Sequence, residues 1–186
     1  NLHWRADKLV LRLRAEGYAV EGVTVSAGVP DVADAVSLVE ACRAQGVAIV
    51  SFKPGTAAQI QQVLEIARRC PDATVGMQVE GGKAGGHHSW EDLRELVRAS
   101  YHQVRALPNV VLSVGGGIRR EEDAWAWLSG AWSESLGLAP MPVDAVFLGT
   151  VAMAAKEAMT SPQVKALLAA TKGTDDWVAP AASQGG

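Results

Sequence analysis

The chain has 186 residues, 48% of them hydrophobic, and a net charge of −3 at pH 7. This length favours one domain, and the composition is typical of a globular protein. The basic excess expected of a nucleic-acid-binding surface is absent, and no apolar run approaches the roughly 18 residues that a membrane-spanning helix needs.

The N-terminal residues, "NLHWRADKLV", show no charged segment followed by an apolar one, so no signal peptide is predicted. They also lack an initiator methionine, which suggests that the sequence is part of a longer chain. Cys42 and Cys70 lie far apart and without metal-ligand spacing. We therefore expect a reducing, cytoplasmic setting.

Hydrophobic periodicity predicts helices and strands that alternate along the chain. In chain order we expect a helix at 2–16, a strand at 22–26, a helix at 30–46, a strand at 47–52, a helix at 55–70, a strand at 74–80, a helix at 89–107, a strand at 109–114, a helix at 120–132, a strand at 144–149 and a helix at 161–171.

Several residues have the side chains or the flexibility that helix ends require. Asp31, Thr56 and Ser89 are predicted N-caps, because their oxygens can accept hydrogen bonds from the first N–H groups of a helix. Gly17 and Gly46 are predicted to end their helices.

The predicted strands read as apolar on both faces, and helices connect them. This pattern predicts an α/β fold with a parallel sheet covered on both sides. Two architectures fit the pattern, an open doubly wound sheet and a (β/α)8 barrel. The chain is short for a barrel, which typically takes about 250 residues, so five βα units would form part of one.

Glycine or polar turns follow the predicted strands. The turns at 115–117 and 149–150, on consecutive strands, place bare N–H groups where a phosphate can bind. Tight βα turns without a ligand explain the same glycines, and both interpretations remain open.

The stretch "EGGKAGGHHS", residues 80–89, joins a strand to a helix. A backbone with so few side chains can lie against a flat ring system. His87 or His88 can donate a proton or a hydrogen bond to a substrate there. A helix-capping or surface role is also open. No metal site is expected, because adjacent histidines diverge and no third ligand is suitably spaced.

Six blocks carry a resemblance that covers residues 22–171: "GVTVSAGVP", "SFKPGT", "GGKAGGHHSWED", "LSVGGGI", "LSGAWSESLGLAPMPVDAVFLGT" and "AMAAKEAMTSPQVKALL". Together they resemble the enoyl reductase region of type I fatty acid synthases of the fungal and actinobacterial type. The Gly-Gly-His loop is also similar to that of nitronate monooxygenase-like flavin enzymes.

The resemblance implies an FMN-binding (β/α)8 barrel, of which residues 1–178 would supply roughly the last five βα units, with 179–186 as a disordered tail or linker. The implied reaction is the reduction of a trans-2-enoyl thioester with NADPH. The implied partners are an acyl-carrier-protein domain that holds the substrate and the other domains of a homo-oligomeric synthase. No nucleic acid or membrane partner is expected.

The resemblance also implies roles for individual residues. His87 matches the catalytic histidine, as a proton donor or as a stabiliser of the thioester oxygen. The implied FMN-binding residues are Gly28, Lys53, Glu80, Gly85, Gly86, Gly116, Gly117, Gly149 and Thr150. Two alternatives remain: a nitronate monooxygenase-like enzyme, or a structural fragment that is inactive in isolation.

Other residues receive structural interpretations. Trp125, Trp127 and Trp132 are predicted to serve packing or contacts between domains. The segment 119–123, "RREED", is predicted to be a solvated helix start, and Lys156 is given a structural role by default.

Overall fold

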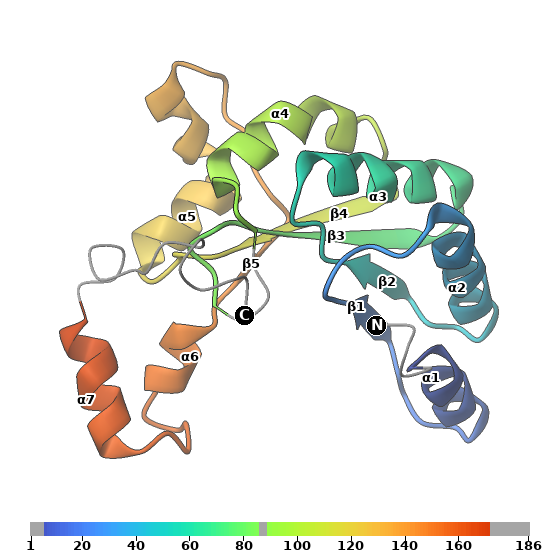
Figure 1. Cartoon of the computed structure of the whole chain (residues 1–186), viewed down its shortest axis with the longest axis horizontal. Coiled ribbons are helices and arrows are strands. Elements are labelled where there is room, and N and C mark those ends of the chain that lie inside the picture. The colour runs from blue at the N-terminus through green and yellow to red at the C-terminus, as the bar shows by residue number, and fades with distance from the viewer. Residues whose placement is uncertain (1–5, 86–88, 172–186) are drawn as a thin grey trace.

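The computed structural model describes residues 6–85 and 89–171, which form alternating helices and strands around one sheet (Figure 1). The elements are α1 Ala6–Ala15, β1 Gly22–Val25, α2 Val32–Ala44, β2 Ile49–Phe52, α3 Ala57–Arg69, β3 Thr74–Glu80, α4 Leu93–Arg105, β4 Val110–Gly115, α5 Glu121–Ser129, the 3₁₀ helix η2 Ala131–Leu136, β5 Ala145–Phe147, α6 Thr150–Ala154 and α7 Pro162–Ala170.

The strands form a five-stranded sheet with the order β1-β2-β3-β4-β5, and every neighbouring pair is parallel. The prediction of a parallel α/β sheet is therefore confirmed. A doubly wound sheet reverses its strand order at a switch point, whereas this order never reverses. Because right-handed crossovers that always step in one direction leave their helices on one face, α2 to α5 follow one another along the same side (Figure 1).

The core lies between these helices and one face of the sheet. The buried strand residues on that face are Val25, Val50, Phe52, Val75, Met77, Val79, Val110, Leu112 and Val114. Alternate positions face the other way and are mostly small or polar, such as Thr24, Ser51, Gly76, Gln78 and Ser113. The expectation of strands that are apolar on both faces is therefore wrong for most of the sheet, because few positions on this second face, such as Ile49 and Val111, hold a large apolar residue.

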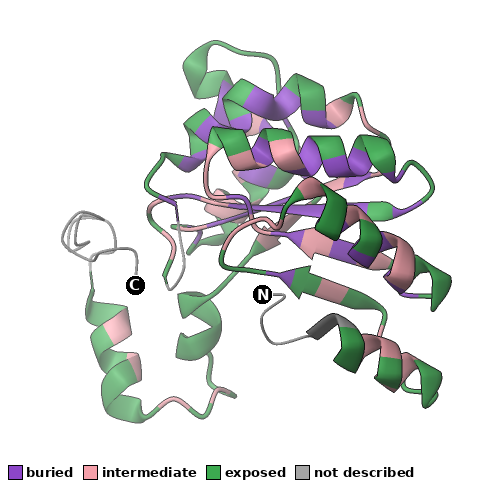
Figure 2. Ribbon diagram, turned by 45° about the vertical axis from the view of Figure 1, so that its right-hand side comes forward, coloured by how far each residue is buried: buried purple, intermediate pink, exposed green. Residues whose placement is uncertain are grey.

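The last two helices differ from α2 to α5 in burial. Neither α6 nor α7 has a buried residue, and both are mostly exposed in Figure 2, whereas α3 and α4 have buried residues along the sides that pack in the core. None of the helices in the described parts of the chain is long and apolar enough to cross a membrane.

Helix ends agree with the sequence at some positions and not at others. Thr56 caps α3 by accepting a hydrogen bond from the Gln59 N–H at 3.2 Å, as predicted. Asp31 occupies the N-cap position of α2, but its side chain makes no capping hydrogen bond.

The prediction that Ser89 caps the next helix is wrong. The N-cap of α4 is Asp92, whose Oδ1 accepts hydrogen bonds from the N–H groups of Arg94 at 2.8 Å and Glu95 at 3.3 Å. Ser89 is buried instead, and its hydroxyl donates to the carbonyl of Gly55. The helix starts later because a carboxylate at 92 accepts from two N–H groups at once.

Candidate functional site

The turns that follow β3, β4 and β5 meet around one cavity of about 730 Å³ at the carboxyl edge of the sheet. Its lining residues come mainly from these three turns and from α7: Glu80, Lys83, Ala84, Gly85, Gly115, Gly116, Gly117, Ile118, Arg119, Phe147, Leu148, Gly149, Thr150, Val151, Ala154, Leu168, Ala169 and Thr171. We call this space the glycine cavity. Its volume lies within the roughly 300–1,000 Å³ typical of small-molecule sites.

Backbone geometry explains why glycine is needed at the β4 turn. Gly116 and Gly117 have φ angles of 105° and 75°, in the left-handed region that glycine adopts most readily. A Cβ atom on Gly116 would lie 3.0 Å from the backbone nitrogen of Ala84. The absence of that atom lets the β3 and β4 turns approach each other.

Two other glycines of this cavity leave open space. A Cβ atom added to Gly85 or to Gly149 would meet no other atom within 4 Å. The cavity wall at these positions is therefore bare backbone, which a ligand can approach closely.

A second cavity, of about 270 Å³, lies at the turns after β1 and β2. We call it the small cavity, and its lining residues are Ala27, Gly28, Lys53, Pro54, Gly55, Thr56, Gln59, Glu80, Ser89 and Trp90. Glu80 lines both cavities, since it stands at the end of the central strand β3.

An ion pair joins β2 to β3 beside the small cavity. The Nζ atom of Lys53 lies 2.9 Å from Oε1 of Glu80, and these side chains are only 21% and 14% exposed. The same oxygen accepts a hydrogen bond from Nε2 of Gln78 at 3.1 Å. Glu80 is therefore held in place by a cation and an amide that come from the sheet.

The structure divides the residues predicted from the sequence into two groups. Gly85, Gly116, Gly117, Gly149 and Thr150 line the glycine cavity together with Glu80. Gly28 and Lys53 line the small cavity, which they share with Glu80, and the two residues form an isolated antiparallel bridge. Gly86, His87 and His88 lie outside the described residues.

Sequence reasoning missed the cationic residues of the glycine cavity. Arg119 lines it, although the sequence of the segment 119–123 indicates only a solvated helix start. Lys83 also lines it, from within the glycine-rich loop. A signal for Arg119 is present in the sequence, since it follows the glycine pair at the end of a strand by two residues, and side chains at strand ends often line a site.

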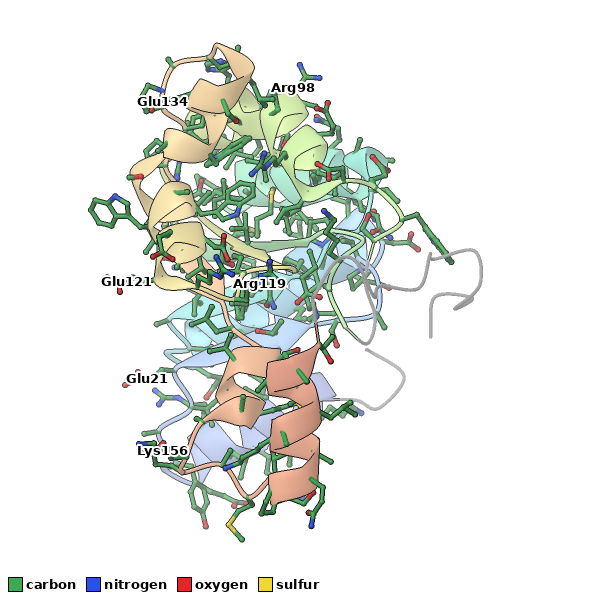
Figure 3. The ribbon with its side chains drawn as sticks, turned by 90° about the vertical axis from the view of Figure 1, so that its left-hand side faces the viewer. Glu21, Arg98, Arg119, Glu121, Glu134 and Lys156 are labelled. Carbon is green, nitrogen blue, oxygen red and sulfur yellow. The ribbon has the colours of Figure 1, made fainter. Side chains whose placement is uncertain are left out.

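Lys156 is placed away from this site, as its structural interpretation expects. Figure 3 shows Arg119 between α5 and α6, whereas Lys156 lies at the far end of α6. The carbonyl of Lys156 accepts a hydrogen bond from Nζ of Lys165 at 3.1 Å.

The tryptophans also divide into two groups. Trp127 and Trp132 are buried, with ring centroids 4.5 Å apart, which confirms a packing role for these two. Trp125 is 68% exposed. No group of three or more histidine, cysteine, aspartate or glutamate side chains suited to a metal ion is found among the described residues.

Comparisons with known proteins agree on one family. A family model described as "Fatty acid synthase subunit beta/Fas1-like, helical" matches residues 74–186. The fatty acid synthase beta subunit hexB of Dothistroma septosporum is 44% identical over 165 residues, which are 89% of this chain and 8% of that protein. Fatty acid synthase 2 of Mycosarcoma maydis is 44% identical over 166 residues, 89% of this chain and 4% of that protein.

A relative from another fungus is covered over a similar share of this chain. The fatty acid synthase subunit beta of Schizosaccharomyces pombe is 38% identical over 168 residues, 90% of this chain and 8% of that protein. The chain belongs to the fatty acid synthase beta subunit family. It spans less than a tenth of the length of these relatives.

Proposed function

We propose that this chain forms the later part of a flavin-dependent (β/α)8 barrel that reduces trans-2-enoyl thioesters with NADPH inside a fatty acid synthase. The observation that carries the proposal is the glycine cavity, where turns from three consecutive parallel strands meet at the carboxyl edge of the sheet. Active sites of barrel enzymes lie at this edge. The singly wound strand order and the family membership support the proposal.

The glycine cavity fits a flat cofactor with a phosphate tail such as FMN. The bare backbone at Gly85 and Gly149 leaves room that a Cβ atom would occupy. The turn at Gly116–Gly117 and the turn at Gly149–Thr150 would hold the phosphate through backbone N–H groups. Lys83 and Arg119 add positive charge to the same cavity.

When bound, FMN would supply hydride transfer between NADPH and the enoyl thioester. In this proposal the carboxylate of Glu80 supports the cofactor side of the site and keeps its orientation through Lys53 and Gln78. His87 acts on the substrate, by protonating it or by donating a hydrogen bond to the thioester oxygen.

The proposal extends to the rest of the synthase. The substrate would arrive on an acyl-carrier-protein domain, and the strands that close the barrel would come from outside residues 1–178, with 179–186 as a tail that lies outside the described residues. We propose a cytoplasmic, homo-oligomeric assembly, as the resemblance implies.

The test is enoyl reduction by the complete synthase that contains this chain. We expect NADPH oxidation with a trans-2-butenoyl thioester and copurification of FMN, and we expect His87→Ala to lose at least about a hundredfold in kcat, which is typical when general acid–base catalysis is removed. His102→Ala, which changes an exposed histidine on α4, is the matched control. Normal reduction by His87→Ala at unchanged FMN content would refute the catalytic role.

A further inference from the structure

We infer that the small cavity is a binding subsite for a carboxamide group, distinct from the glycine cavity. The inference rests on the proposed function only for the identity of the molecule that carries this group. Three independent features of the small cavity lead to it: a strained wall, a fixed amide donor and a neutralised cation.

The strained wall is the turn after β1. Ala27 has a φ angle of 63°, and no other residue except glycine has a positive φ in the described parts of the chain. Gly28 follows with a φ angle of 108° and bridges to Lys53. Such conformations gather at sites of function, where the surrounding structure holds them in place.

The fixed donor is the side-chain amide of Gln59. Its Oε1 accepts a hydrogen bond of 2.7 Å from the Gly55 N–H, which orients the amide. Its Nε2 consequently points toward Gly28, where a Cβ atom would lie 3.8 Å away. No hydrogen bond from Nε2 to an acceptor is found in the described part of the chain. An oriented, half-buried donor on a cavity wall is suited to an acceptor on a ligand.

The charges of the cavity select a neutral acceptor. Lys53 is neutralised by Glu80 at 2.9 Å, so a phosphate entering the cavity would meet a carboxylate beside the ammonium group. A carbonyl oxygen meets no such repulsion and can accept from Gln59 Nε2 or from Lys53 Nζ. The carboxylate of Glu80 can in turn accept from the N–H group of the same ligand. An amide group carries both a carbonyl oxygen that accepts and an N–H group that donates, so it can form both kinds of hydrogen bond.

The dimensions and walls of the cavity are consistent with this ligand. Its volume of about 270 Å³ admits one end of a larger molecule. Pro54 and the 55% exposed side chain of Trp90 provide apolar surface for the carbon atoms next to the amide. Under the proposed function, the carboxamide belongs either to the nicotinamide of NADPH or to the pantetheine arm of the thioester substrate.

The experiment uses the variant Gln59→Glu. This change keeps an oxygen that accepts from the Gly55 N–H and replaces only the donor Nε2. The matched control is Gln61→Glu, the same change of charge at an exposed position on the same helix, α3. Circular dichroism checks that each variant retains the secondary structure of the unmodified chain.

Binding is measured on the chain by saturation-transfer NMR with two neutral probes, pantetheine and 1-benzyl-1,4-dihydronicotinamide. We expect one probe to bind, Gln59→Glu to weaken it about tenfold and Gln61→Glu to leave it unchanged. The probe that responds identifies the source of the amide. If Gln59→Glu fails to fold, Trp90→Leu at the exposed rim replaces it, with the same expected weakening. Binding of neither probe, or equal binding by the variant and the control, overturns the inference.

A kinetic experiment separates this inference from the proposed function. In the complete synthase, Gln59→Glu should raise KM for the amide-bearing reactant about tenfold while FMN content and KM for the other reactant are retained. A trans-2-butenoyl ethyl thioester, which has no amide, should be insensitive to the variant if pantetheine is the ligand. Enoyl reduction with unchanged KM values overturns the subsite alone. Absence of enoyl reduction in the unmodified synthase overturns the proposed function, and the binding experiment then decides the subsite.

Discussion

The backbone of Ala27 gives a prediction at the scale of one residue. An L-residue in the left-handed region costs about 1–2 kcal/mol, and glycine avoids this cost. Glycine also makes the unfolded chain more flexible, which offsets about 0.4–1 kcal/mol of the gain. We therefore expect Ala27→Gly, at a φ angle of 63°, to increase the free energy of unfolding by about 0.5–1 kcal/mol in urea titrations.

A second alanine provides the control for this prediction. Ala58 is exposed and lies in the first turn of helix α3, where glycine is less favourable than alanine by up to about 1 kcal/mol. Ala58→Gly should therefore destabilise the chain, with the opposite sign. If both variants were destabilised equally, the strain assigned to Ala27 would be wrong.

Cys70 connects a single side chain to the pH dependence of stability. Burial raises the pKa of its thiol above the ordinary value of 9.0, and the charge of Glu40 raises it further. Above pH 9.0 the unfolded thiol ionises while the folded thiol keeps its proton. The folded state then binds more protons than the unfolded state, so stability falls as the pH rises through this range.

Removing this thiol should flatten the alkaline part of the stability curve. We expect the free energy of unfolding of Cys70→Ala to decline less between about pH 8 and pH 10 than that of the unmodified chain. Glu40→Gln should produce a smaller change, because burial is the larger cause of the raised pKa. Parallel curves for all three proteins would show that Cys70 does not contribute.

At the scale of elements, the sequence predicted what local chemistry determines. Strand β3 has the predicted bounds, 74–80, because a β-branched and apolar run has clear ends. Thr56 is predictable as a cap because its position before a periodic apolar run is a local signal. The prediction for Ser89 fails because its hydroxyl donates a hydrogen bond to a distant partner, the carbonyl of Gly55, which no local pattern reveals.

The connection between α5 and η2 yields a prediction that compares two glycines. Gly130 and Gly137 flank η2, with φ angles of 85° and 72°. A Cβ atom on Gly130 would lie 2.6 Å from the nitrogen of Pro142, whereas one on Gly137 would meet nothing within 4 Å. Backbone atoms cannot move aside as a flexible side chain can.

Alanine at the two positions should therefore have unequal costs. Gly137→Ala should lower the free energy of unfolding by about 1–2 kcal/mol, which is the cost of placing an L-residue in the left-handed region. Gly130→Ala should lower the free energy of unfolding by a further 1–3 kcal/mol, roughly the cost of overpacking, because η2 must separate from the segment before β5. Urea unfolding of both variants measures the difference, and equal losses would contradict the close approach seen at Gly130.

At the scale of the whole molecule, the sequence predicted parallel strands but not the side on which the core lies. Short strands with Val and Ile at many positions read as apolar throughout, so the local pattern does not reveal that small or polar positions such as Ser51 and Gly76 form a separate face. Strand order depends on long-range pairing, which local patterns do not contain. Likewise, the sequence placed glycines at strand ends, yet only the fold shows that Gly28 and Lys53 line a different cavity from Gly116.

The two outer strands test whether the sheet is a sector of a closed barrel. In this structure β3 is paired on both sides, by β2 and β4, whereas β1 and β5 are each paired on one side. Amides in edge strands open more readily than amides in central strands, because fewer contacts must break. In the 186-residue chain we therefore expect that, among the five strands, hydrogen exchange is fastest at Gly22–Val25 and Ala145–Phe147 and slowest at Thr74–Glu80.

The complete synthase should change this pattern if the proposed barrel closes. Both outer strands then gain a second neighbour, and the apolar residues of α6 and α7, such as Val151 and Leu167, gain cover. Hydrogen exchange in peptides that contain β1 or β5 should slow by at least about tenfold, which corresponds to an opening free energy larger by about 1.4 kcal/mol. Exchange in peptides from β3 should change little. Mass spectrometry of both proteins measures the ratio. Outer strands that exchange equally fast in both would mean that the sheet stays open, and the barrel would be rejected independently of the chemistry at its edge.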